Sequence, residues 1–120
     1  MSAHPERIPQ HLQDIADSIG TIKHYLGNCT RDQFDHNKML QDAVIRRLEI
    51  IGEAARRIEK DDKNFISAHP QLQLIKAYGM RNRLSHAYDV VNIDIVWDVA
   101  QTSLASMADA ITKHLAQKNQ

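Results

Sequence analysis

The sequence LQDAVIRRLEIIGEAARRI, residues 40–58, has apolar side chains that recur at steps of three and four residues. The main stripe consists of Leu40, Val44, Leu48, Ile51, Ala55 and Ile58. Because an α-helix turns once in about 3.6 residues, this spacing puts the stripe on one face and predicts an amphipathic helix. Ala43, Ile50 and Ala54 widen the apolar face, so we expect the helix to contact more than one neighbour.

Gly52 lies in the middle of this predicted helix, where glycine costs about 1 kcal/mol relative to alanine. Close approach of a neighbouring helix would compensate for that cost. The run DDKN at residues 61–64 is polar and predicts the end of the helix.

The residues before this stretch predict a first helix with the same periodicity. Its apolar face consists of Ile8, Leu12, Ile15, Ile19, Ile22 and Leu26. Gly27 follows as a C-terminal stop signal. Thr30 and Gln33 have the spacing of a capping box, which predicts a short helical turn from about residue 31.

The residues after this stretch predict two further helices. Proline disfavours helical backbone at the residue before it and suits the first helical position, so we expect a third helix from Pro70 to about His86. Its apolar positions are Leu74, Ile75 and Tyr78. Asn92 is a good N-cap for a last helix, whose stripe is Val96, Ala100, Leu104, Met107, Ile111 and Leu115. Four helices with short connections predict an all-α fold, an antiparallel four-helix bundle with a short extra helical turn.

Length and composition indicate a single domain over residues 1–120. Lys+Arg and Asp+Glu number 15 each, so the formal net charge is zero. A protein that binds nucleic acid without selectivity would be basic overall, so any contact with RNA must be confined to a small part of the surface. Cys29 is the only cysteine, which excludes an internal disulfide. No apolar run approaches the roughly 20 residues of a membrane span, and residues 1–7 lack a signal peptide's apolar core. We therefore expect a cytoplasmic protein with no membrane contact.

The residues with the clearest chemical potential are 79–88, GMRNRLSHAY. Histidine titrates near neutral pH and can accept a proton, and the arginine fork suits phosphate. His86 could therefore activate an RNA 2′-hydroxyl for attack on the adjacent phosphate, and Arg81 could stabilise the charge on phosphorus. Asn82 and Ser85 could orient either group. Such a reaction requires the 2′-hydroxyl of RNA and no metal.

The geometry of a continuous helix would separate the two principal groups. Asn82 and His86 would share a face, whereas Arg81 and His86 would lie about 140° apart around the axis. One undistorted helix could not easily aim both at one small atom, but two copies facing across a two-fold axis could line a common cleft. We therefore expect a homodimer. The competing interpretation is that an arginine, a histidine and a tyrosine near a helix end have no catalytic role and serve as a helix cap, a surface charge and a surface aromatic ring.

Metal and cofactor sites are not expected. The seven histidines show no His-x-x-x-His or clustered spacing of the kind that binds zinc.

The segment Arg81-Asn82-Arg83-Leu84-Ser85-His86 resembles the HEPN signature, an arginine, a polar residue, a short spacer and a histidine. The extension to Tyr88 is similar to the narrower HepT branch, with Arg, four residues, His, any residue and Tyr. Residues 43–55 resemble the second helix of that family, and residues 93–97 the start of its last helix. The three blocks occur in order between residues 43 and 97.

This resemblance implies an HEPN-like bundle and a ribonuclease toxin of an MntA–HepT toxin–antitoxin pair. It assigns Arg81 and His86 as the catalytic pair and Asn82 as a support of their geometry. Tyr88 matches the tyrosine that the MntA-like nucleotidyltransferase antitoxin modifies with AMP from ATP, which silences the toxin. The family acts as homodimers with the site at the subunit interface.

Two features of the predicted second helix have alternative interpretations. Glu53 could reach the motif and orient Arg81, or form an ordinary ion pair. Arg46 and Arg57 lie about three turns apart on one face and could follow RNA, but the interspersed glutamates fit a solvated, salt-bridged face equally well. The alternative function is a non-catalytic helical partner that positions a nucleotidyltransferase or its substrate.

Overall fold

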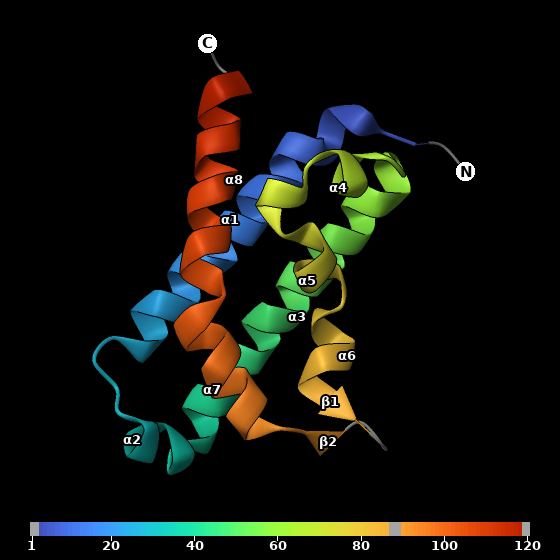
Figure 1. Cartoon of the computed structure of the whole chain (residues 1–120). Coiled ribbons are helices and arrows are strands. Elements are labelled where there is room, and N and C mark those ends of the chain that lie inside the picture. Colours follow the sequence, from blue (N-terminus) through green and yellow to red (C-terminus); the bar gives the residue numbers. More distant parts are fainter. Residues whose placement is uncertain (1–2, 87–89, 119–120) are drawn as a thin grey trace.

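The computed structural model describes residues 3–86 and 90–118. Figure 1 shows the course of the chain. Its elements are η1 (Pro5–Arg7), α1 (Ile8–Leu26), α2 (Arg31–Asp35), α3 (Lys38–Asp61), α4 (Phe65–Ala68), η2 (Pro70–Leu72), α5 (Leu74–Tyr78), α6 (Met80–Leu84), β1 (Ser85–His86), β2 (Val90–Val91), α7 (Ile93–Thr102) and α8 (Leu104–Lys118).

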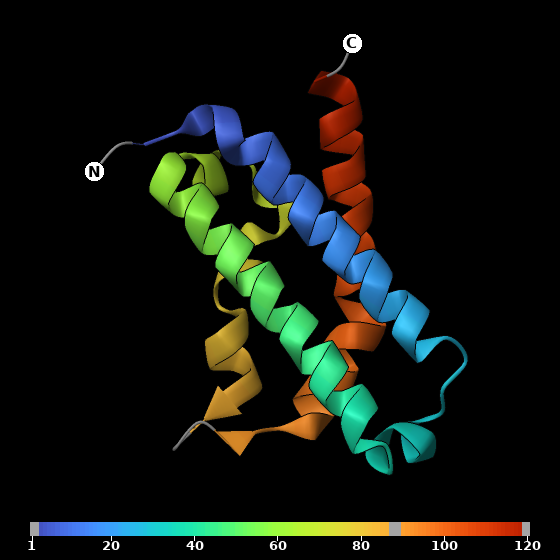
Figure 2. The same cartoon turned by 180° about the vertical axis from the view of Figure 1, so that it is seen from behind.

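The antiparallel pair α1 and α3 forms the centre of the fold, as Figure 2 shows from behind. All six predicted apolar positions of the first stripe are buried, and in α3 only Leu40 of the main stripe is partly exposed. The helix ends also agree with prediction. Gly27 adopts a φ of 50° after α1, and Thr30 and Gln33 form a complete capping box on α2. The prediction of the first two long helices and the short turn is therefore confirmed.

The predicted continuous helix from Pro70 to His86 is wrong. The chain forms η2, α5 and α6 in succession, and it leaves the helix at Leu84. Gln73 interrupts the helix because it adopts the left-handed conformation, with a φ of 60°. Of the three apolar positions predicted for this helix, Leu74 is buried, whereas Ile75 and Tyr78 are 71% and 41% exposed.

The last predicted helix is interrupted at Ser103, between α7 and α8. The hydroxyl of Thr102 donates a hydrogen bond of 2.6 Å to the carbonyl oxygen of Asp98, one turn earlier. Such back-bonding competes with the backbone ladder and bends helices. The N–H of Ser103 still donates to the carbonyl of Val99 at 3.1 Å, so the interruption is slight.

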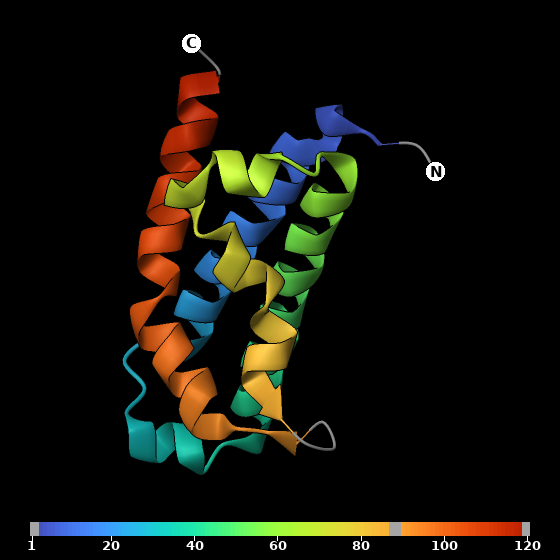
Figure 3. The same cartoon turned by 45° about the vertical axis from the view of Figure 1, so that its right-hand side comes forward.

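Four helical layers, α1, α3, α5–α6 and α7–α8, surround one apolar core (Figure 3). The expected all-α bundle is thus confirmed, with one addition: the two-residue strands β1 and β2 pair antiparallel. Among the described residues, no helix combines the length and the apolar character that crossing a membrane requires.

Candidate functional site

Helix α6 presents its polar residues to solvent because its apolar residues face the core. Met80 and Leu84, four residues apart, are 0% and 2% exposed. The three residues between them, Arg81, Asn82 and Arg83, are exposed. The packing of α6 therefore places the first two motif residues on the protein surface.

The position of α6 depends on Gly52 of α3. A Cβ atom at this residue would lie 3.4 Å from the carbonyl oxygen of Ala77, 3.5 Å from Cβ of Met80 and 3.9 Å from the backbone nitrogen of Arg81. The expected close approach at Gly52 is confirmed, and it brings α3 directly against the backbone that carries Arg81.

The chain after α6 becomes extended, and backbone hydrogen bonds hold it to the segment that precedes α7. Ser85 pairs with Val91, and His86 pairs with Val90, in the short antiparallel ladder. The N–H of Asn92 donates a 2.8 Å hydrogen bond to the carbonyl oxygen of Leu84. His86 is therefore fixed by its backbone between the end of α6 and the start of α7.

This local structure changes the geometric argument made from the sequence. Because α6 ends at Leu84, Asn82 and His86 do not share a helical face, and the angle of about 140° between Arg81 and His86 does not apply. The helix distorts instead, which removes the geometric reason for requiring a second copy. Tyr88 lies outside the described residues.

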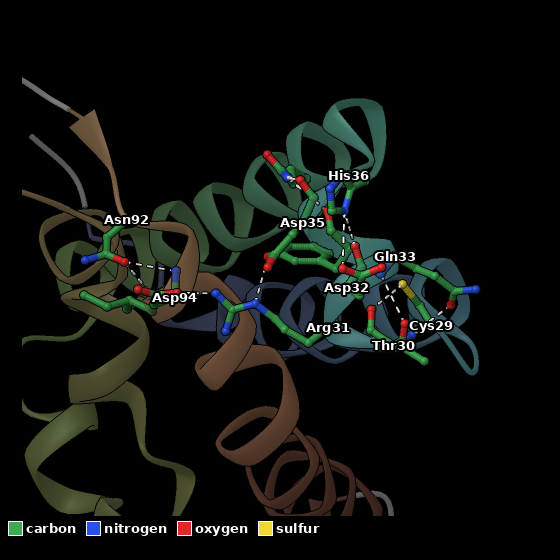
Figure 4. Close-up of polar contacts among 12 residues, drawn as sticks. Cys29, Thr30, Arg31, Asp32, Gln33, Asp35, His36, Asn92 and Asp94 are labelled. Atoms are coloured by element: carbon green, nitrogen blue, oxygen red, sulfur yellow. Dashed lines mark hydrogen bonds and ion pairs between the residues drawn. The ribbon is translucent and has the colours of Figure 1, made fainter.

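The start of α7 is held by a network of hydrogen bonds and ion pairs, drawn in Figure 4, of which the sequence predicted only the Asn92 cap. The side chain of Asn92 accepts hydrogen bonds from the N–H groups of Asp94 at 3.0 Å and Ile95 at 3.3 Å, which confirms it as the N-cap. Arg31 of α2 pairs with Asp35 at 2.8 Å and also with Asp94. These hydrogen bonds to Asp35 and Asp94 raise the pKa of Arg31.

Arg31 therefore ties α2 to the helix that follows the motif hairpin. No sequence signal indicated this pair, since Arg31 and Asp94 lie 63 residues apart.

Glu53 lies one residue beyond Gly52 on α3. Its carboxylate is 3.5 Å from Nε of Arg57, and both side chains are 60% exposed. This is the ordinary ion pair that the sequence left open, and the orientation of Arg81 by Glu53 stays a prediction. The side chains of Arg46, Arg56 and Arg57 are exposed, as is that of Glu53, so the solvent-facing side of α3 has charges of both signs.

Candidate metal ligands are dispersed. Within residues 3–86 and 90–118, no three histidine, cysteine, aspartate or glutamate side chains gather in a way that could hold an ion.

Comparison with known proteins places this geometry in context. The family model described as "Ribonuclease HepT-like" matches residues 15–114. A protein of Thermococcus cleftensis named "Probable ribonuclease HepT" is 34% identical over 103 residues, which cover 86% of this chain and 91% of that protein. No solved structure gives a significant match.

Two proteins of Methanocaldococcus jannaschii, both named "Putative RNase", are also similar. One is 36% identical over 88 residues, covering 73% of this chain and 70% of the relative. The other is 32% identical over 118 residues, covering 95% and 99%. The similarity thus extends over nearly the whole bundle as well as the motif.

Proposed function

Because the chain belongs to the ribonuclease HepT-like family, we propose that it is a metal-independent endoribonuclease toxin of a toxin–antitoxin pair. The observation that carries this proposal is the position of Arg81, exposed on α6 and followed within five residues by His86 on the adjoining strand. An arginine and a histidine so close together can serve one phosphodiester.

In the proposed reaction, His86 takes the proton of an RNA 2′-hydroxyl. The 2′-oxygen bonds to the adjacent phosphorus while the bond from phosphorus to the 5′-oxygen breaks, and solvent protonates the departing oxygen. The products are a 2′,3′-cyclic phosphate and a 5′-hydroxyl. Arg81 stabilises the negative charge on the pentacoordinate phosphorus, and Asn82 supports this geometry.

The packing of α3 against α6 suggests which residues support Arg81. Gly52 allows α3 to lie close to the backbone of Arg81, and Glu53 is the next residue along. In the proposal the carboxylate of Glu53 pairs with Arg57 and also with Arg81, and the second contact orients the Arg81 guanidinium. Carboxylate pairing would hold the guanidinium plane in position for the phosphate.

The homodimer is part of the proposal and rests on the family resemblance. In this arrangement the two motif hairpins face one groove, and RNA enters between the subunits. A stable monomer at micromolar concentration would contradict it.

The proposal also includes control of the ribonuclease activity by a nucleotidyltransferase. Tyr88 lies two residues past His86, and AMP attached to its hydroxyl would bring a negative charge and a purine to the site. The charge would engage Arg81 in place of the RNA phosphate.

The activity is tested by incubating the purified protein with RNA and with DNA of the same sequence. The proposal predicts cleavage of the RNA alone, since DNA lacks the attacking hydroxyl. Equal cleavage of both strands would contradict the mechanism, and cleavage of neither would contradict the activity.

A further inference from the structure

A small pocket lies where α3, α4 and α5 meet. It has a volume of about 280 Å³ and is lined by Glu59, Ile66, Ile75 and Tyr78. Helix α5 turns Leu74 and Ala77 to the core and leaves Ile75 and Tyr78 71% and 41% exposed. Ile66 is buried and forms the apolar floor.

The aromatic ring at this pocket is already paired with a cation. The guanidinium carbon of Arg56 lies 5.5 Å from the centroid of the Tyr78 ring. An exposed aromatic ring beside an arginine is the arrangement on which proteins stack the unpaired bases of single-stranded RNA. Both groups present flat surfaces that can contact a base.

The pocket is adjacent to the proposed reaction centre along the chain. Tyr78 is the last residue of α5, and Arg81 is the second residue of α6, three positions later. The N–H of Arg83 donates to the carbonyl of Gly79 at 2.9 Å, so the helical backbone resumes directly after Tyr78. Three residues of chain span at most about 11 Å, so Tyr78 lies within reach of a nucleotide next to a phosphate held at Arg81.

We propose that this pocket is a subsite for one base of the RNA substrate, next to the scissile phosphate, and that Glu59 makes it selective for guanine. The inference rests on the proposed ribonuclease function. An ionised carboxylate only accepts hydrogen bonds. Guanine alone among the RNA bases presents two adjacent donors, N1–H and the N2 amino group, on its Watson–Crick edge, and these match both oxygens of a carboxylate. The other three bases place an acceptor beside each donor.

A second copy of the chain fits this pocket less well. Stable protein–protein interfaces bury about 800 Å² on each partner. The exposed apolar part of the pocket consists of Ile75 and Tyr78, and the charged groups of Arg56 and Glu59 adjoin them. That composition suits a flat, polar-edged ligand such as a base.

The test measures binding separately from cleavage. Pentanucleotides with 2′-O-methyl groups throughout, carrying central guanine or central adenine, are titrated into the wild-type protein and its variants. Tyr78→Ala is expected to weaken binding of both oligonucleotides about tenfold, since base stacking on an aromatic ring contributes on this scale. Glu59→Gln is expected to keep the binding of the adenine oligonucleotide and to abolish the preference for guanine.

Two matched controls are available in the same chain. Tyr25→Ala removes a tyrosine that is also 41% exposed, and Glu6→Gln neutralises an exposed glutamate on η1. Both are expected to bind like wild type. Wild-type affinity and base preference in Tyr78→Ala and Glu59→Gln would overturn the inference. A lower solution mass for Tyr78→Ala would also overturn it, because it would assign this surface to contact between copies.

The assay also distinguishes failure of the subsite from failure of the proposed function. Guanine-selective binding by a protein that does not cut unmodified RNA would contradict the ribonuclease proposal and leave the subsite standing. Cleavage without base preference, unchanged in Glu59→Gln, would contradict the subsite and leave the ribonuclease standing.

Discussion

Nε2 of His11 lies 2.8 Å from Oδ2 of Asp61, with both side chains buried, at 11% and 8% exposure. Because a carboxylate can only accept, Nε2 carries the hydrogen and donates it. The second oxygen of Asp61 accepts from the backbone N–H of His4 at 3.2 Å. This carboxylate therefore joins the start of α1 and the residue before η1 to the last residue of α3.

The first prediction concerns acid stability. The hydrogen bond from His11 lowers the pKa of Asp61 below its ordinary value, with the backbone N–H of His4 assisting against the opposing effect of burial. A carboxyl whose pKa is lower in the folded state stabilises the fold above its unfolded pKa of about 3.9, and this stability is lost as the pH falls through the folded pKa. Asp61→Asn should therefore show a shallower loss of stability below pH 4 in chemical denaturation. The exposed Asp109→Asn is the control, and an unchanged pH slope in Asp61→Asn would contradict the assignment.

The second prediction concerns Gly52. A methyl group would make ordinary contacts at 3.4 Å and 3.5 Å, so Gly52→Ala should fold, gain up to about 1 kcal/mol of helix propensity and keep its activity. Gly52→Leu should displace α5 and α6, cost about 1–3 kcal/mol and reduce RNA cleavage. Urea denaturation and cleavage rates measure both effects.

Gly20 supplies the control for this pair, because a Cβ there would meet nothing within 4 Å. Gly20→Leu should be neutral or stabilising. Full cleavage by Gly52→Leu would show that the close approach does not position Arg81.

The elements that could be predicted are those with strong local signals. Thr30, Gln33 and Asn92 satisfy backbone groups within three residues of themselves, so their roles depend little on the rest of the fold. The break at Gln73 carries no such signal, since the left-handed conformation is usually taken by glycine. The extended backbone at His86 likewise depends on pairing with Val90.

The candidate site was predicted only in part for the same reason. Exposure of Arg81 follows from the four-residue spacing of Met80 and Leu84, which the sequence contains. The contact between Arg31 and Asp94 joins distant segments, and the pocket at Tyr78 is lined by residues from three separate helices. The sequence predicted Tyr78 only as an apolar position of the third helix.

The third prediction concerns control of the activity. Incubation with a cognate MntA-like nucleotidyltransferase and ATP should add one or more AMP units to Tyr88 and abolish RNA cleavage without loss of the fold. Tyr88→Phe should gain no mass and remain an active ribonuclease, because it lacks the acceptor hydroxyl. Intact mass and cleavage are measured on the same samples. AMP on another residue, or full cleavage by the modified protein, would refute this control.

The roles of Arg81 and His86 are tested by cleavage of a 5′-labelled RNA in EDTA by wild type, Arg81→Ala and His86→Ala, with Arg83→Ala as the exposed neighbour control. Wild type and Arg83→Ala should produce a 2′,3′-cyclic phosphate, and a 2′-O-methyl group at the scissile position should prevent the cut. Arg81→Ala and His86→Ala should each cut at least about 100-fold more slowly, since proton transfer and charge stabilisation each contribute on that scale. Wild-type rates in these two variants, or loss of wild-type cleavage in EDTA, would contradict the assignment of Arg81 and His86 as the active site.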